Sequence, residues 1–280
     1  MIRPMLATDV APLVEVQHQT FDDLARRINE APFELTPDTR ERLTARMAHL
    51  QASDPESAWA AEVDGELVGC ALALVRDGMW FLSLLMVKPG YQGKGIGREL
   101  LDASLTTSTD RSWILSTVEP AAVRRYQRAG FALHPTYSAK GVPDRAAIPA
   151  VSGVRVGGDE HAETMDQVLR VLRGAGLGAE AGFYAERGSS IAVVPGKGFA
   201  VLRPLGTAWL GAVDEATARD LLWTVLAEAT EPVEIDWLGA DQQWGVDVCL
   251  DARLTLGAGA SVCLRGQPTM SPYLPSGAFG

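Results

Sequence analysis

The residues best suited to bind a phosphate group lie in the segment 87–97, which reads Val-Lys-Pro-Gly-Tyr-Gln-Gly-Lys-Gly-Ile-Gly. An apolar run, residues 80–86, precedes this segment, and an amphipathic stretch, residues 98–105, follows it. This order predicts a strand that ends at Val87, then a turn and a glycine-rich loop that opens a helix. The first N–H groups of such a helix have no intrahelical partner and lie at the positive end of its dipole. The segment therefore predicts a site for a phosphate or pyrophosphate.

The glycine spacing distinguishes this loop from two other phosphate-binding motifs. Gly93, Gly95 and Gly97 would let the backbone approach a ligand closely, because glycine has no Cβ. Lys94 does not stand in the frame that a P-loop requires, and the glycines do not fit the dinucleotide fingerprint G-x-G-x-x-G. A glycine-rich connection that binds no ligand is the alternative interpretation.

The loop resembles the acetyl-CoA loop of the GCN5-related N-acetyltransferases (GNATs), which has the pattern Q/R-x-x-G-x-G/A after a strand ending in V-x-P. Residues 92–97 meet this pattern at each defined position. The resemblance implies that acetyl-CoA is the co-substrate. It also implies that the edge of the strand before the loop pairs with the pantetheine arm, with an amide at or near Val87 facing the thioester oxygen. The residues expected to bind acetyl-CoA are Leu85, Met86, Val87, Gln92, Gly93, Lys94, Gly95, Ile96, Gly97 and Arg98.

Acetyl transfer to an amine also needs a deprotonated amine, a hydrogen-bond donor for the oxyanion and a proton for the leaving thiolate. In the GNAT family a Tyr four residues before Gly-Phe lies beside the CoA sulfur, and Tyr126 precedes Gly130 and Phe131 with this spacing. A phenol with a pKa near 10 can protonate a thiolate while remaining neutral at pH 7. Tyr126 is therefore the candidate acid. A tyrosine packed only for its ring is the alternative.

One position departs from the family pattern. The family has Asn seven residues before this Tyr, whereas this chain has Glu119, followed by Pro120. Glu119 is either a general base near the acceptor amine or an acidic residue favoured by the helix dipole, and we favour the second interpretation. Glu62 and Ser83 are weaker candidates for the base, and ordered water is a further one.

The acceptor pocket is harder to assign. The residues expected to line it are Phe21, Trp59, Trp80 and Ser83, although core packing is the competing interpretation for each aromatic ring. An acidic cluster near the first helix could favour a cationic amine, or it could be only a solvated face. Its members are Asp22, Asp23, Glu30 and Glu34.

The elements that must position these residues follow the order βααβββαβαβ in the first half of the chain. Strands are predicted at residues 2–4, 58–63, 67–75, 80–87, 113–118 and from 131 onward. Helices are predicted after an Asp9 N-cap and at residues 39–52, 95–107 and 121–129.

The second half repeats this order more loosely. Strands are predicted at residues 154–156, 190–194, 199–203, 208–213 and 233–237, and helices at 159–174 and 214–229. We therefore expect an α/β protein with mixed sheets and two tandem GNAT domains, residues 1–145 and 151–280, with the boundary in the Pro- and Gly-containing stretch 135–153. An unrelated α/β partner domain is the alternative.

The second copy has none of the chemistry of the first. Its counterpart of the loop begins Asp214-Glu215 and has no glycine before Ala229, so two carboxylates in the first helical turn would repel a pyrophosphate. Cys249 stands at the position of Tyr126. Acetyl-CoA is therefore expected in the first half only.

Composition limits the remaining possibilities. The chain has 280 residues, 47% hydrophobic, and a net charge of −10, which disfavours nucleic acid and anionic membrane as partners. Its start lacks the apolar core of a signal peptide, so we expect a cytoplasmic protein. The three Cys and four His show no metal-ligand spacing, and no metal is expected. The apolar residues of the tail 268–280 predict that it docks.

Taken with the resemblance, these features predict an N-acetyltransferase that moves the acetyl group of acetyl-CoA to a primary amine of a small molecule by direct attack. Two alternatives stay open. One is an acyltransferase with another acyl donor, or with a hydroxyl or protein-lysine acceptor. The other is a non-catalytic protein that binds acyl-CoA or sequesters a small molecule. A homodimer is also left open.

Overall fold

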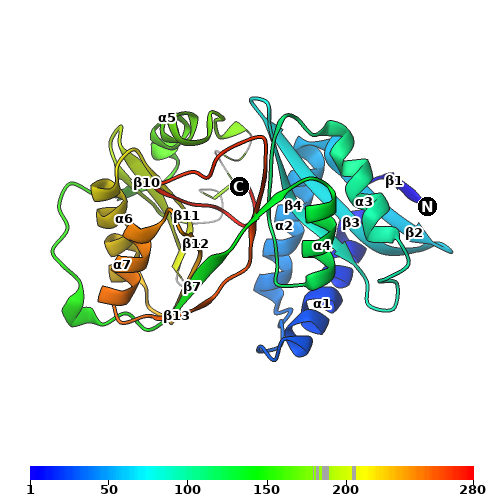
Figure 1. Ribbon diagram of the computed structural model, residues 1–280, viewed down its shortest axis with the longest axis horizontal. Helices are drawn as coiled ribbons and strands as arrows, with labels where there is room; N and C mark the ends of the chain where they lie inside the picture. The colour runs from blue at the N-terminus through cyan, green and yellow to red at the C-terminus, as the bar shows by residue number, and fades with distance from the viewer. Residues whose placement is uncertain (179, 181–182, 185–188, 204–205) are drawn as a thin grey trace. The chain divides into compact units, whose positions relative to one another are not determined.

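The computed structural model describes residues 1–178, 180, 183–184, 189–203 and 206–280. The chain divides into two compact units (Figure 1). The first unit comprises Met1–Val75 and Trp80–Ser112, and the second comprises Arg76–Met79 and Trp113–Gly280.

The first unit is built on four neighbouring strands in the order β1-β2-β3-β4. Their bounds are β1 Ile2–Pro4, β2 Ala58–Val63, β3 Glu66–Arg76 and β4 Met79–Val87. The turns at residues 64–65 and 77–78 are Asp-Gly pairs with positive φ at both positions, which is the geometry of a type I′ hairpin turn. The three successive strands predicted from the sequence are confirmed.

Helices of the first unit follow the predicted positions to within a few residues. They are α1 Val10–Arg27, α2 Pro37–Ser53 and α3 Ile96–Ser104, with short 3₁₀ turns at Ala7–Asp9, Pro55–Ser57 and Leu105–Thr107. α2 begins where the Thr36 hydroxyl accepts from the Thr39 N–H at 3.2 Å and Pro37 takes the first helical position. Leu100 of α3 packs on Ala61 of β2 and Val68 of β3.

The prediction that Asp9 is the N-cap of α1 is confirmed, although its side chain makes no capping bond to that helix. Asp9 occupies the N-cap position, but its carboxylate accepts from the Leu6 N–H at 2.8 Å and pairs with Arg3 at 2.7 Å. Arg3 and the Leu6 amide together lower the pKa of the Asp9 carboxyl, the hydrogen bond from Arg3 being the main cause. A partly buried ion pair with Arg3 therefore takes the carboxylate that the helix N-terminus would otherwise bind.

The second unit contains a five-stranded antiparallel sheet in the order β15-β11-β10-β9-β8. Its strands are β8 Arg155–Gly157, β9 Ile191–Val194, β10 Gly198–Arg203, β11 Gly206–Ala212 and β15 Tyr273–Leu274. The predicted strands near residues 154, 190, 199 and 208 are confirmed, whereas β15 was not predicted.

Two further groups of strands in this unit combine distant parts of the sequence. β14 Val262–Arg265 lies between β5 Arg111–Leu115 and β6 Ala132–His134. β7 Thr136–Gly141 lies between β12 Val233–Gly239 and β13 Thr255–Ala258 and is antiparallel to both. Thus β14, from residues 151–280, lies between two strands of residues 1–145. In the same way β7, from residues 1–145, lies between two strands of residues 151–280. Strand pairing does not follow the division expected at residues 145–151.

The helices of the second unit support the interpretation of a repeated element. They are α4 Pro120–Arg128, α5 Ala162–Arg173, α6 Glu215–Glu228 and α7 Gln243–Asp251, with 3₁₀ turns at Arg145–Ala147 and Asp159–His161. Two residues after the end of each of α4 and α7 stands a residue of positive φ, Gly130 at 87° and Arg253 at 62°. The next N–H then bonds back five residues, to Tyr126 O in one helix and to Cys249 O in the other. α7 was not predicted as a helix.

The tail docks within the second unit, as expected. Leu274 and Tyr273 pair with Leu210 and Gly211 of β11, and the Tyr273 hydroxyl accepts from Trp209 Nε1 at 2.6 Å. Phe279 has no exposed surface, and its ring centroid lies 4.9 Å from that of Phe183.

Candidate functional site

The loop between β4 and α3 is open at the N-terminus of the helix. Gly93 and Gly95 have φ of 77° and 93°, and Gly95 is the N-cap of α3 with no side-chain cap. Among the described residues, no acceptor bonds the backbone N–H groups of residues 92–97. A Cβ on Gly93 would meet nothing within 4 Å, and one on Gly95 would meet only Glu99 Oε1, at 3.8 Å. Six successive donors are thus available to an anion.

Four side chains hold this loop in place, and three of them, Glu66, Lys88 and Tyr91, were not singled out from the sequence. The Tyr91 hydroxyl donates to Glu66 Oε2 at 2.7 Å, and Lys88 pairs with the same carboxylate. These two contacts lower the pKa of Glu66, with the Lys88 hydrogen bond contributing most. Gln92 Nε2 donates to Val87 O at 2.9 Å and ties the loop to the end of β4. The bond of Gln92 joins two residues that are close in the sequence. Glu66, by contrast, reaches the loop only because β3 folds back against β4.

Two exposed cations lie on the loop and the first turn of α3. Lys94 Nζ is 5.0 Å from the centroid of the Tyr91 ring, and Arg98 Nε is 3.9 Å from Asp102 Oδ2. Both side chains are open to solvent, so they can turn toward a bound phosphate at little cost. Glu99 is the acidic residue of the same turn and the nearest unfavourable charge.

The end of β4 lies tightly against β3. Met86 is buried, whereas Leu85 and Val87 are partly exposed. A Cβ on Gly69 of β3 would lie 2.5 Å from Met86 O and 3.3 Å from Val87 Cα. Glycine at this position therefore lets the two backbones approach at the strand end that leads into the loop.

The four residues expected to line an acceptor pocket lie in different surroundings. Trp80 has no exposed surface and belongs to the core. Trp59 packs in the cluster under α3, with Ile96 and Leu100. Ser83 receives hydrogen bonds from Arg46 Nη2 at its carbonyl and its hydroxyl oxygens, at 2.7 and 2.8 Å.

Phe21, the fourth of these residues, is partly exposed, and its ring lies 5.9 Å from that of Phe33. The acidic cluster beside it is in part paired, since Asp22 and Asp23 form ion pairs with Arg26 and Arg27. These pairs favour the interpretation of a solvated helix face.

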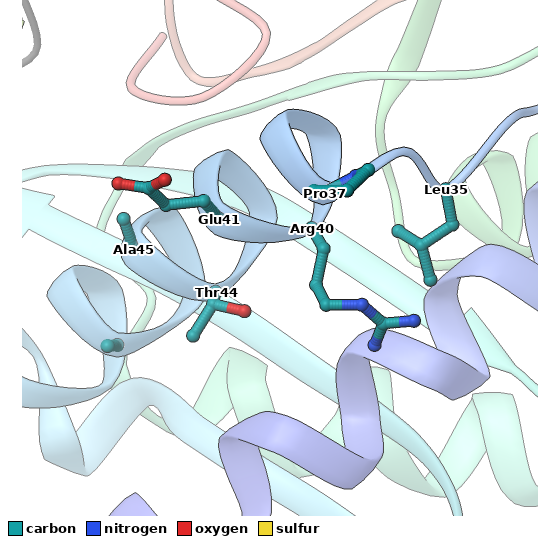
Figure 2. A pocket seen from close by; sticks show the side chains of 7 residues that line it. Leu35, Pro37, Arg40, Glu41, Thr44 and Ala45 are labelled. Atoms are coloured by element: carbon teal, nitrogen blue, oxygen red, sulfur yellow. The ribbon is translucent and has the colours of Figure 1, made fainter.

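A groove does run along one face of α2, and Figure 2 shows its lining side chains. The cavity measures about 660 Å³. Its lining residues are Leu35, Pro37, Arg40, Glu41, Thr44, Ala45 and Ala48. None of the four residues expected from the sequence is among them.

Tyr126 lies on α4 in the second unit. Burial raises the pKa of its phenol, and the neighbouring Cys263 adds to the effect. Only 5% of the residue is exposed, and no group in the described part of the chain hydrogen-bonds its hydroxyl. The hydroxyl thus keeps its proton well above neutral pH. Its expected place beside a thioester stays a prediction.

Glu119 is the N-cap of the same helix. Its carboxylate accepts from the Ala121 N–H at 3.1 Å, and Pro120 takes the first helical position. This is the structural role favoured from the sequence. A role as a general base is not needed to explain the residue.

The counterpart of the loop in the second unit is closed by its own side chain. Asp214 caps α6, and its carboxylate accepts from the Thr217 N–H at 2.8 Å and from the Thr217 hydroxyl at 3.0 Å. The bond from the Thr217 amide is the main cause of the lowered pKa of Asp214. The Asp214 carboxylate thus occupies the N-terminus of α6, whereas no side chain caps the N-terminus of α3 in the first unit.

Two further properties of the described residues concern membranes and metal ions. No helix in the described ranges is long and apolar enough to cross a membrane. Within the same ranges, no group of three or more His, Cys, Asp or Glu side chains is placed to hold a metal ion.

Part of the chain matches a known protein family, and the fold is shared with several solved structures. Residues 21–131 match the acetyltransferase (GNAT) family. The fold is similar to that of a Pyrococcus horikoshii protein solved as a candidate acetyltransferase, with 16% identity, a TM-score of 0.79 and coverage of 100% of this chain and 95% of that chain. No curated protein has a matching sequence.

Two other solved structures share the fold over nearly the whole chain. A tandem GNAT protein from the clavulanic acid biosynthesis pathway has 14% identity and a TM-score of 0.59, with coverage of 96% of this chain and 99% of that chain. A GCN5-related N-acetyltransferase from Sphaerobacter thermophilus has the same identity and TM-score, with 96% of each chain covered. The resemblance seen in the sequence is therefore confirmed: residues 21–131 match the acetyltransferase (GNAT) family, and the chain has a fold similar to that of a tandem GNAT protein.

Proposed function

We propose that the protein transfers the acetyl group of acetyl-CoA to a primary amine of a small molecule. The observation that carries this proposal is the row of N–H groups of residues 92–97, which have no acceptor among the described residues. These donors lie at the uncapped N-terminus of α3, where the helix dipole favours an anion. A CoA pyrophosphate has the charge and size for this site, and the GNAT domain over residues 21–131 supports the choice of ligand.

In this proposal the strand edge at Leu85, Met86 and Val87 binds the amide groups of the pantetheine arm. A backbone N–H at or near Val87 would donate to the thioester oxygen, where negative charge develops as the amine attacks. The bond from Gln92 Nε2 to Val87 O supports this assignment, because it fixes the strand end relative to the loop.

Tyr126 would supply the proton for the leaving group. As the new C–N bond forms and the C–S bond breaks, the phenolic O–H donates its proton to the sulfur, and the proton lost by the amine returns the phenol to its neutral form. Burial raises the pKa of Tyr126, which keeps the phenol protonated until the thiolate appears. The amine itself must arrive neutral, with water as its base.

The second unit would bind no CoA through its own loop. The Asp214 carboxylate already bonds the amide at the start of α6, and its charge would repel a pyrophosphate. The proposal therefore predicts one molecule of acetyl-CoA per chain.

Isothermal titration with acetyl-CoA tests the proposal. We expect saturable binding of one equivalent by the wild type, and Gly95→Asp should weaken it at least about 100-fold, or about 2.7 kcal/mol. The matched control is Gly196→Asp, because Gly196 also has a positive φ and open space around its Cα. This control separates loss of the anion site from general backbone strain.

Tyr126→Phe should bind acetyl-CoA like the wild type but turn over an amine about 10²- to 10⁴-fold more slowly. Absence of binding by the wild type would contradict the proposal. Equal weakening by Gly95→Asp and Gly196→Asp would also contradict it.

A further inference from the structure

A second cavity, of about 420 Å³, lies wholly within the second unit. Its walls come from the ends of several strands, including β7 and β12, which Figure 1 labels, from the turn that precedes α7, and from the tail. The residues that matter below are Trp113, Trp237, Asp241, Met270 and Tyr273, all of which line the cavity. A volume of this size suits a small organic molecule.

Aromatic rings form much of the wall. Trp113 and Tyr273 are buried, with ring centroids 6.2 Å apart, and Trp237 is partly exposed. Gly277 of the tail lies against Trp237, since a Cβ there would be 3.1 Å from Trp237 Cη2. Indole rings bind both apolar groups and organic cations, because the ring face carries partial negative charge.

One carboxylate oxygen at this cavity has no partner. Asp241 Oδ2 is buried, and no donor among the described residues bonds it. Asp241 stands two residues before α7. A buried polar oxygen without a hydrogen bond is costly, and native structures normally supply a donor from the protein, from water or from a ligand. Asp241 as a whole is partly exposed, and a ligand that donates a hydrogen bond inside the cavity would satisfy this oxygen.

The backbone at Trp237 is strained in a way typical of ligand sites. Trp237 has a φ of 57°, in the left-handed region that bulky side chains avoid. The pairing of β12 with β7 shifts register between Ile235 and Leu238, so a bulge re-aims this side chain. Such strain is concentrated at binding and catalytic sites.

The wall that the tail contributes is fixed by one buried amide. Gln242 Nε2 donates to Met270 O at 2.5 Å, and Gln242 Oε1 accepts from the Tyr273 N–H at 3.1 Å. The Ser271 hydroxyl donates to Asp241 O at 2.7 Å. The tail is thus held at the same turn that carries the carboxylate, and the cavity is preformed.

We infer that this cavity binds an organic ammonium ion, with Asp241 as its counter-ion and the rings of Trp113 and Trp237 around its apolar part. A primary or quaternary ammonium group would supply the positive charge that the buried oxygen lacks. The inference goes beyond the proposed function, because it requires neither acetyl-CoA nor the loop of the first unit. Failure of one therefore does not imply failure of the other.

Titration of the full chain with 2-phenylethylamine and with benzyltrimethylammonium, in the absence of acyl-CoA, tests the inference. We expect saturable binding of at least one of the two cations, and at least about 10-fold weaker binding of the neutral analogue 2-phenylethanol. Asp241→Asn should remove this preference. The matched control is Asp251→Asn, at the exposed C-terminal end of the same helix, which should keep it.

A second variant locates the site. Met270→Trp adds bulk at the wall without touching Asp241, and it should abolish binding while the thermal transition stays close to that of the wild type. The inference is overturned if neither cation binds the wild type, if the alcohol binds as tightly as the amine, or if Asp241→Asn keeps the preference. Unchanged binding by Met270→Trp would overturn it as well.

Discussion

Gly69→Ala tests how closely the end of β4 must approach β3. A Cβ on Gly69 would lie 2.5 Å from Met86 O, with Leu100 Cδ1 and Val87 Cα both at 3.3 Å. A carbon atom and a carbonyl oxygen rarely approach closer than about 3.3 Å, so the strand end must move by roughly 0.8 Å. Because the clashing atom belongs to the backbone, rotation of a side chain cannot relieve it.

We expect this substitution to lower the free energy of unfolding by about 1–3 kcal/mol, the usual cost of overpacking. It should also weaken acetyl-CoA binding, since the displaced backbone is the edge proposed to hold the pantetheine arm. Urea denaturation and isothermal titration measure the two effects. Gly257→Ala is the control, because a Cβ there meets nothing within 4 Å. If Gly69→Ala matched Gly257→Ala in both assays, the argument from close approach would be refuted.

Two other predictions concern carboxylates that bind backbone amides. Asp214→Ala should destabilise the protein by about 1 kcal/mol through loss of the α6 cap, whereas Asp220→Ala, exposed on the same helix, should have little effect in the same urea titration. The second prediction is a pH dependence. The lowered pKa of Asp9 means that its pairing with Arg3 stabilises the folded state above the ordinary carboxyl pKa of about 3.9, and that this stability is lost as the pH falls below that value. The stability difference between the wild type and Asp9→Asn, measured from pH 7 to pH 3, should therefore shrink on acidification, and a constant difference would contradict the assignment.

Features set by neighbouring residues were predictable from the sequence. The Asp-Gly turns at 64–65 and 77–78, the strand that ends at Val87 and the helix that follows Gly95 depend on local backbone preference and on short periodic patterns. The position of the glycine-rich loop between β4 and α3 follows from the same local signals.

Features set by distant partners were not predictable. Trp59 and Trp80 could be pocket residues or core residues, with core packing favoured for each ring alone, because a sequence does not show what covers the second face of a strand. The Asp9 carboxylate could bind either the N-terminus of α1 or the Arg3 guanidinium, and only the structure shows that it binds Arg3. Trp237 gave no signal, because its strain depends on a bulge in a strand paired with residues about 100 positions away.

The placement of β14 between β5 and β6 has a consequence for synthesis on the ribosome. β6 ends at His134 and β14 begins at Val262, 128 positions later. At about 5–20 residues per second, the facing edges of β5 and β6 stay without their central strand for roughly 6–26 s after they emerge. Unpaired strand edges are templates for pairing with another chain. The nascent protein therefore passes through a period in which chaperone binding, or pairing with a neighbouring nascent copy, competes with arrival of its own strand.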